Sequence, residues 1–160
     1  MSDAATKSMR TKSRYESDFF AWTQEQGERL RRRAHNDVDW ENVAEEIETL
    51  GRTERSEIAS RLHVLLVHLL KWQFQPEARS YGWKGTIVEQ RVRLRRALRD
   101  SPSLKTYPSE VLDEEYASAR LKAAGETGQV LTTFPASCPY SVAEVIESDA
   151  FPAGDDVAEA

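Results

Sequence analysis

The chain has 160 residues and a mass of 18.2 kDa, enough for a single domain to bury a core without disulfides or a structural metal. Hydrophobic residues make up 39% and charged residues 31%, which excludes both a largely disordered chain and a membrane protein. No apolar run reaches the roughly 18 residues of a membrane-spanning helix, and the first residues lack the apolar run of a secretory signal. With one cysteine, Cys138, the chain can form no internal disulfide, and we expect a cytoplasmic protein.

Charge is segregated along the chain, although the net charge is only −5. Residues 1–35 carry 8 basic and 5 acidic side chains, residues 36–75 carry 4 and 8, residues 76–105 carry 8 and 3, and residues 106–160 carry 2 and 11. Two interpretations stay open. Either successive elements attract one another across their polar rims, or the charges form solvated faces and an acidic tail, since single surface pairs contribute little.

The chain is expected to begin with a mobile arm and a first helix. Residues 1–14 are small, polar and basic, and a basic arm of this kind would suit contact with an acidic polymer. A helix is predicted from Tyr15 to about His35, because apolar and aromatic residues recur there at spacings of three and four. Its stripe consists of Tyr15, Phe19, Trp22, Gln26 and Leu30.

Two further helices are predicted between Asp39 and Pro76. Asp39 is a suitable N-cap, and the helix that follows is expected to break or kink at Gly51. The apolar face of this helix consists of Trp40, Val43, Ala44, Ile47 and Leu50. The next helix begins at Arg52 or Thr53 and closes at Pro76. Because residues 62–72 are apolar on nearly every side, we expect it to be the central element.

The second half of the chain is also predicted to be helical. Ser80 can cap a fourth helix that ends at Ser101, and a fifth helix runs from about Pro108 to Ala124, with Gly125 or Gly128 as its stop signal. The prolines of residues 134–139 forbid a helix there, so we expect an extended segment whose Phe134 packs on the bundle.

The pattern S-x-x-E at Ser141 and Glu144 predicts a short last helix. The fold class is therefore all-α: a compact bundle of about four to five main helices plus a short C-terminal helix and mobile tails. We expect one domain over residues 15–150 and a disordered acidic tail over residues 151–160.

A metal site and an ion-pair network are alternative interpretations of the same polar residues. Glu45 and Glu48 on one helix and His68 on the next would supply three ligands for Mn, Fe or Zn, so a metal ion is the one cofactor that this set suggests. The set is incomplete for a two-metal bundle, because no Glu stands three residues before a histidine. Alternatively, Glu48 pairs with Arg52, and Arg91, if buried, pairs with Glu45 or Glu48.

Aromatic and basic residues suggest a second kind of site. Trp72 and Trp83 flank the connection before the fourth helix, beside Lys71. Aromatic rings among cations are typical of nucleic-acid sites, although tryptophans near helix ends are also ordinary packing residues. The fourth helix exposes Arg93, Arg95, Arg96 and Arg99, but a sequence pI near 5.3 argues against DNA binding.

Several segments taken in order resemble a known family. They are YESDFFAW from Tyr15, NVAEEIETLGRTERSE from Asn42, RLHVLLVHLLKWQFQP from Arg61, the segment from Trp83 that ends in EQR at Arg91, SPSL from Ser101 and FPASCPYS from Phe134. Together they resemble the bacterial family catalogued as domain of unknown function twenty-nine. The resemblance implies an all-helical fold and a bacterial origin, and it brings no activity or cofactor. It also marks a candidate polar patch made of Glu45, Glu46, Glu48, His68, Lys71, Trp72, Trp83 and Arg91.

No G-x-S-x-G motif and no phosphate-binding glycine loop occurs, so we expect a protein that is not an enzyme. The favoured function is a helical module that binds another protein or itself, away from membranes. One alternative is a metal-binding protein or metal-dependent hydrolase using Glu45, Glu48 and His68. Another is a nucleic-acid-binding protein using the arginine face of the fourth helix. A protein partner would leave an exposed apolar patch on the structure.

Overall fold

The computed structural model describes residues 13–153, which form helices joined by turns and one extended segment. No strand occurs among these residues, and the predicted all-α fold class is confirmed. The chain divides into two compact units, Met1–Gly51 and Arg52–Ala160. The predicted arm lies outside the described residues as far as residue 12, and the predicted tail lies outside them from residue 154. Within residues 13–153, no helix combines the length and the apolar character that crossing a membrane requires.

The first unit begins with two capped helices, α1 (Arg14–Ser17) and α2 (Phe19–Arg31). Ser13 and Glu16 form a capping box, in which each backbone N–H donates to the other side chain at 3.0 and 3.3 Å. Asp18 then interrupts the single helix predicted from Tyr15, because its carboxylate accepts a backbone hydrogen bond at 3.0 Å and caps α2. α2 is followed by a short 3-10 helix, η1 (His35–Asp37).

A small core joins α2 to the start of α3 (Trp40–Phe74) in the first unit. Trp22, Gln26 and Val38 are buried there. Asp39 links the start of α3 to α2 by two hydrogen bonds. Its carboxylate accepts from the Trp22 indole at 3.3 Å, and its N–H donates to the Gln26 amide oxygen at 2.9 Å. The Asn42 side chain also donates to Asp39, at 2.7 Å. The backbone N–H of Asn42 donates to the Asp39 carboxylate at 3.4 Å, so Asp39 caps α3, as the sequence predicts.

The predicted break at Gly51 is wrong, because α3 is one continuous helix from Trp40 to Phe74. A single glycine in a helix interior costs only about 1 kcal/mol relative to alanine, and its immediate neighbours Leu50 and Arg52 are good helix formers. Gly51 also lacks the positive φ that would mark a helix end. Three residues beyond Gly51, Glu54 accepts a hydrogen bond from the Ser101 hydroxyl within the second unit.

The second unit packs the later turns of α3 with α4 (Tyr81–Asp100) and α5 (Tyr107–Thr127). Short 3-10 helices connect them, η2 (Pro76–Ala78) and η3 (Pro102–Leu104). Ser80 caps α4 by accepting from the Trp83 N–H at 3.2 Å, as predicted. All three helices contribute to one core, and the later turns of α3 supply more of its buried residues than α4 or α5. Its fully buried residues include Ile58, Leu62, Leu65, Leu66, Leu69 and Leu70 from α3, Ile87 and Leu94 from α4, and Tyr116 from α5.

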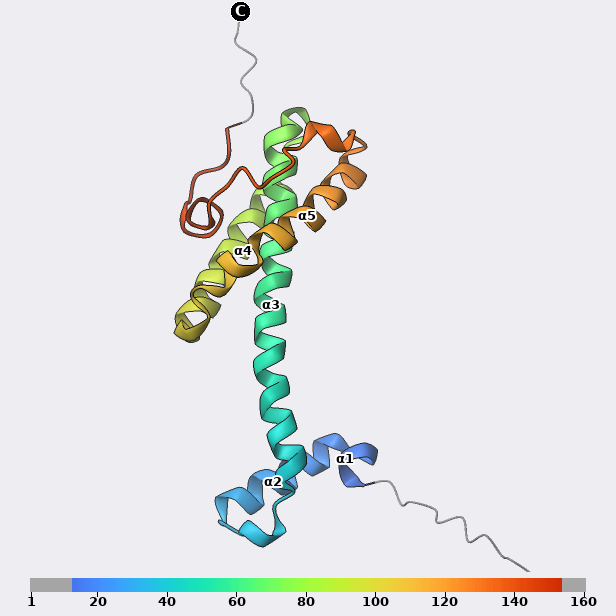
Figure 1. Cartoon of the computed structure of the whole chain (residues 1–160), viewed down its shortest axis with the longest axis vertical. Coiled ribbons are helices and arrows are strands. Elements are labelled where there is room, and N and C mark those ends of the chain that lie inside the picture. Colours follow the sequence, from blue (N-terminus) through green and yellow to red (C-terminus); the bar gives the residue numbers. More distant parts are fainter. Residues whose placement is uncertain (1–12, 154–160) are drawn as a thin grey trace, which may run out of the picture. The chain divides into compact units, whose positions relative to one another are not determined.

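The chain after α5, residues 128–153, returns along the second unit toward α4 and is called the returning chain (Figure 1). It contains a 3-10 helix, η4 (Leu131–Thr133), the predicted extended segment from Phe134, and a π-helical turn, η5 (Ala143–Glu147). The Phe134 side chain is buried in the core, as predicted. The Ser141 hydroxyl and the Glu144 carboxylate form the predicted capping box of η5, with bonds of 2.7 and 3.2 Å.

Two glycines near the end of α5 are expected to respond in opposite ways to alanine. Gly125 lies inside the helix and a Cβ there would meet nothing within 4 Å, so Gly125→Ala should raise the free energy of unfolding by up to about 1 kcal/mol. Gly128 ends the helix with φ +68°, so Gly128→Ala should lower it by about 1 kcal/mol. Urea unfolding followed by circular dichroism measures both variants. Equal effects of the two substitutions would contradict this assignment of the helix end.

Candidate functional site

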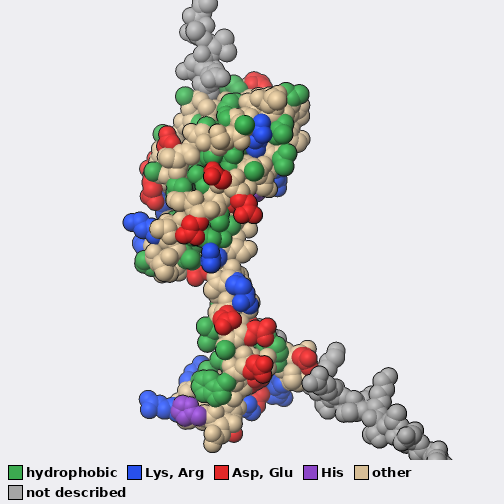
Figure 2. All heavy atoms as spheres, in the orientation of Figure 1, with side chains coloured by type: hydrophobic (Ala, Val, Ile, Leu, Met, Phe, Trp, Pro, Cys, Tyr) green, Lys and Arg blue, Asp and Glu red, His purple; other side chains and the backbone are tan. Residues whose placement is uncertain are grey.

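An apolar face of α3 lies open on the first unit. Trp40 is 51% exposed, Ile47 is 65% exposed and Leu50 is 70% exposed. Ala44 and Gly51 are exposed on the same side. Four of these residues recur at spacings of four, three and four and therefore share one helix face. We call this face the α3 seam; it consists of Trp40, Ala44, Ile47 and Gly51. Figure 2 shows hydrophobic side chains on the surface of this unit next to acidic ones.

Acidic residues border the α3 seam. Glu41, Glu45 and Glu48 are exposed and follow one another at spacings of four and three along the helix. On the other side of the helix, Glu46 accepts a hydrogen bond from the Tyr15 hydroxyl, which raises the pKa of Tyr15 to about 12. Glu46 therefore serves the packing of the first unit, whereas the other three glutamates belong to its surface.

The sequence predicts that this apolar face points inward, and that expectation is wrong for its large residues. The half-buried side of the helix instead carries Asn42, Val43, Glu46 and Thr49. The described part of the first unit covers the polar side of α3 with α1 and α2, through the hydrogen bond from Tyr15 to Glu46 and the buried Trp22, and leaves the apolar side uncovered.

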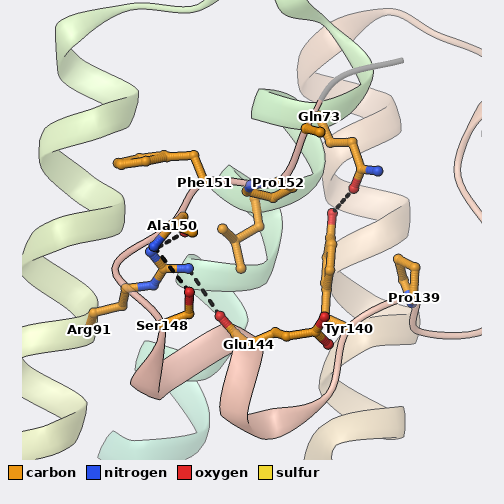
Figure 3. A pocket seen from close by; sticks show the side chains of 11 residues that line it. Gln73, Arg91, Pro139, Tyr140, Glu144, Ser148, Ala150, Phe151 and Pro152 are labelled. Carbon is orange, nitrogen blue, oxygen red and sulfur yellow. Dashed lines mark hydrogen bonds between the residues drawn. The ribbon is translucent and has the colours of Figure 1, made fainter. Parts of the chain in front are cut away.

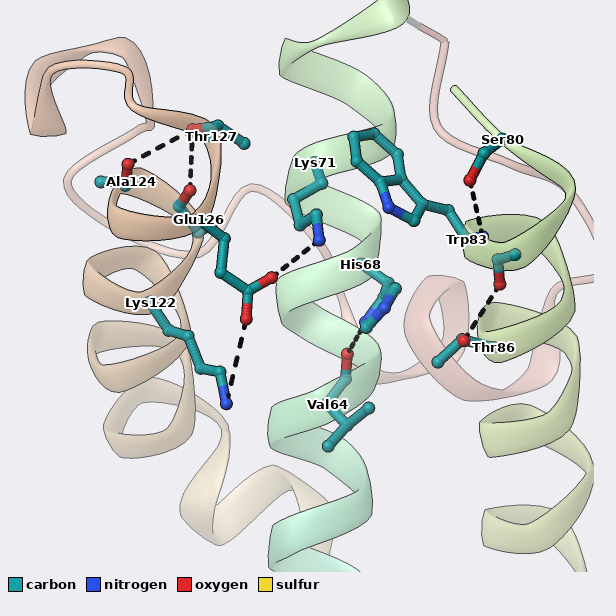
Figure 4. A network of polar contacts seen from close by, with 12 residues as sticks. Val64, His68, Lys71, Ser80, Trp83, Thr86, Lys122, Ala124, Glu126 and Thr127 are labelled. Carbon is teal, nitrogen blue, oxygen red and sulfur yellow. Dashed lines mark hydrogen bonds and ion pairs between the residues drawn. The ribbon is translucent and has the colours of Figure 1, made fainter. Parts of the chain in front are cut away.

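In the second unit, Lys71 is the centre of a polar network (Figure 4). Lys71 is buried, donates to Glu126 at 2.7 Å and lies over the Trp83 ring, 4.6 Å from its centroid. The hydrogen bond from the Lys71 ammonium lowers the pKa of Glu126. One turn earlier, His68 Nδ1 lies 2.8 Å from the Val64 carbonyl, an acceptor, so this nitrogen carries the hydrogen. The structure thus brings together three residues of the predicted patch and adds Glu126, which no local motif in the sequence marks.

The stability of the second unit should depend on the protonation of His68. Burial lowers the pKa of His68 below its ordinary value of 6.5, so the folded protein favours the neutral imidazole. This contribution to stability is complete above pH 6.5 and is lost as the pH falls toward the folded pKa. His68→Gln replaces the ring N–H donor with an amide N–H donor and removes the titrating group. The free energy of unfolding of this variant should therefore fall less between about pH 7.5 and about pH 5.5. An unchanged pH dependence in urea unfolding would show that His68 does not contribute.

Arg91 is a buried cation whose partners are backbone carbonyls. Its Nε donates to Val145 at 2.9 Å, its Nη1 to Ala150 at 2.7 Å and its Nη2 to Glu144 at 3.1 Å. The predicted pairing of Arg91 with Glu45 or Glu48 is wrong, because the returning chain supplies three carbonyl oxygens at this point. Burial lowers the pKa of Arg91. Arg91 therefore fastens residues 144–150 to α4.

A cavity of about 340 Å³ lies beside Arg91 and is lined mainly by the returning chain (Figure 3). The Tyr140 hydroxyl donates to the Gln73 side chain at 2.6 Å on one wall. Phe151 forms another wall and packs on Trp72, with 4.8 Å between the ring centroids. Trp72 is thus a packing residue for the returning chain. Phe151, at the start of the predicted disordered tail, belongs to this packing.

The comparisons with known proteins add one match. The family model described as "Domain of unknown function DUF29" matches residues 14–151. The chain belongs to the DUF29 family. No curated protein and no solved structure matches the sequence.

In this DUF29 protein, the predicted metal ligands lie in different units. Glu45 and Glu48 belong to Met1–Gly51, and His68 belongs to Arg52–Ala160. Among residues 13–153, no group of three or more His, Cys, Asp and Glu side chains is placed to hold a metal ion. The metal site stays a prediction that no contact in the described part of the chain supports.

The arginines of α4 in this DUF29 protein have acidic or carbonyl partners. Arg93 pairs with Glu89 at 2.8 Å, and Arg95 donates to the Ile146 carbonyl at 2.7 Å. Arg95 also pairs with Asp149 at 2.8 Å, which ties it to the returning chain. Arg96 and Arg99 lie 3.6 and 3.8 Å from Asp100 and remain exposed. The predicted arginine face is therefore partly neutralised by its own chain.

Proposed function

We propose that this DUF29 protein is a non-catalytic interaction module that binds a helical protein surface through the α3 seam. The observation that carries the proposal is the exposure of Trp40 and Ile47, two large apolar side chains on one helix face. Burying such side chains against a partner lowers the free energy by about 25 cal/mol for each Å² of apolar surface removed from water. Tryptophan, the residue at position 40, is one of the residue types that are enriched among interface anchors.

The acidic residues that border the α3 seam favour a partner with basic residues around its own apolar face. Between Trp40 and Leu50 the helix carries Glu41, Glu45, Glu46 and Glu48 and no basic residue. A complementary partner would present an apolar helix face bordered by lysine or arginine, since opposite charges around an apolar contact favour the correct pairing and its register. The proposal includes a cytoplasmic location, which suits a chain whose single thiol, Cys138, has no second cysteine to pair with.

Photo-crosslinking in cells tests this function. A photoreactive phenylalanine at position 47 should form a discrete crosslinked protein product, and the same residue at Glu114, an exposed position of α5, should not. Ala44→Glu places a charge in the α3 seam and should abolish the product from position 47. Equal products from positions 47 and 114, or a product unaffected by Ala44→Glu, would contradict the proposal.

A further inference from the structure

A second apolar face lies open on α4, in the second unit. Tyr81 is 94% exposed, Val88 is 47% exposed and Val92 is 57% exposed. Gly85 is exposed between them, with nothing within 4 Å of the place where a Cβ would stand. We call this face the α4 seam. It consists of Tyr81, Gly85, Val88 and Val92, which recur at spacings of four, three and four. This is the same spacing as in the α3 seam, so the two faces have equal length, about 16 Å.

The two seams are complementary in shape when the helices run antiparallel. Aligning Trp40 with Val92 places Ala44 opposite Val88. The same alignment places Ile47 opposite Gly85, and Gly51 opposite Tyr81. A larger side chain then meets a smaller one at each level, which is the condition for close helix packing. In the parallel alignment, Trp40 would instead face Tyr81, and Ala44 would face Gly85.

The charges around the two seams are also complementary. Residues 40–50 carry four acidic side chains and no basic one, whereas α4 carries six basic and two acidic side chains. The basic residues of α4 are Lys84, Arg91, Arg93, Arg95, Arg96 and Arg99. In the antiparallel alignment, Glu48 lies level with Lys84, and Glu41 lies level with position 91, two residues before Arg93. Arg93 and Arg96 are exposed on this part of α4, each with an acidic neighbour on its own helix, Glu89 at 2.8 Å and Asp100 at 3.6 Å.

We infer that the α3 seam of one copy packs antiparallel on the α4 seam of a second copy, and that two such reciprocal contacts form a dimer. This inference rests on the proposed function and names its partner as a second copy of the chain. The partner is argued from the chain itself, which presents both halves of one complementary contact. Each copy presents one acidic and one basic apolar face, and a dimer with both contacts leaves neither face exposed.

Sedimentation velocity of the purified full-length chain tests the inference. The wild-type protein should be a dimer, and Ile47→Glu and Val88→Glu should each raise the dimer dissociation constant on the order of 100-fold by burying an unpaired charge. Leu121→Glu is the matched control, because Leu121 is an equally exposed apolar residue on α5, outside both seams. It should leave the dimer unchanged. Circular dichroism spectra should show that all three variants stay folded.

Mixing the two seam variants separates reciprocal pairing from other arrangements. A heterodimer of the Ile47→Glu and Val88→Glu variants places both defects in one contact and leaves the other contact intact. The mixture should therefore form dimers at concentrations where each variant alone is monomeric. If the α3 seam paired with itself, Val88→Glu would have no effect, and mixing would restore nothing.

The outcomes distinguish this inference from the proposed function. A wild-type chain that is monomeric at all concentrations overturns the inference. If position 47 then still crosslinks to a different protein, the interaction function stands with another partner. If position 47 forms no specific product either, both proposals fail.

Discussion

Phe134→Ala is expected to lower the free energy of unfolding of the second unit by about 4 kcal/mol, because it removes a buried aromatic ring and leaves a cavity. The Phe134 ring packs against Phe74, with 5.5 Å between centroids and planes at 70°. The backbone on either side is held as well: Arg120 donates to the Phe134 carbonyl at 3.0 Å, and the Tyr116 hydroxyl donates to the Pro135 carbonyl at 2.7 Å. The residue therefore anchors the returning chain to α5 and α3.

Urea unfolding measures the effect of Phe134→Ala, with two controls. Phe134→Leu keeps most of the apolar volume and should cost about 1 kcal/mol. Val130→Ala changes an exposed residue four positions earlier and should cost less than about 0.5 kcal/mol. A small effect of Phe134→Ala, similar to that of Val130→Ala, would show that the extended segment is not part of the core.

Arg91→Met is expected to lower the free energy of unfolding by about 3 kcal/mol. Methionine fills much of the same volume, but the carbonyls of Glu144, Val145 and Ala150 lose their donors, each at a cost of about 1 kcal/mol or more. The relief of a desolvated cation offsets part of this loss. Residues 144–150 should also become more accessible to solvent.

Urea unfolding and hydrogen exchange measure the Arg91→Met variant. Arg93→Met is the matched control on the same helix, because Arg93 is exposed and its side chain pairs with Glu89 one turn away. It should change the unfolding free energy by less than about 0.5 kcal/mol. Arg91→Lys keeps the positive charge but lacks the several N–H donors of the guanidinium. Its free energy of unfolding should lie between those of the Arg91→Met and Arg93→Met variants. If the Arg91→Met and Arg93→Met variants unfold alike, the carbonyl contacts do not stabilise the fold.

Local signals in the sequence predicted most of the helices. Asp39, Ser80 and Ser141 act as the caps that their neighbours suggest, because a cap depends on residues within one helical turn. The predicted break at Gly51 is wrong because one glycine is a weak stop signal, and its immediate neighbours in α3 favour a continuous helix. Asp18 could have been identified as a cap, since it precedes an aromatic and helical run.

The candidate site was harder to predict, because it depends on contacts between distant residues. Arg91 finds its partners more than fifty residues later, in carbonyl groups that every sequence contains. Glu126 lies fifty-five residues after Lys71, and no spacing rule links them. Of the predicted apolar face of α3, Trp40, Ala44, Ile47 and Leu50 are exposed, whereas Val43 lies on the half-buried side. Its exposure follows from the small size of the first unit, because α1 and α2 contact the other side of α3 and no helix among the described residues of this unit covers the apolar side.

The most direct test of the account is disulfide trapping between two single-cysteine variants. Both variants carry Cys138→Ser, which removes the half-buried native thiol that donates to the Tyr140 carbonyl. One variant adds Ile47→Cys and the other Gly85→Cys, two positions that face each other in the antiparallel alignment. An equimolar mixture under mild oxidation should give a heterodimer joined by a 47–85 disulfide, more rapidly than either variant links to itself. Self-linked products alone, or no linkage above the level of an Ile47→Cys and Leu121→Cys mixture, would contradict the α3–α4 contact.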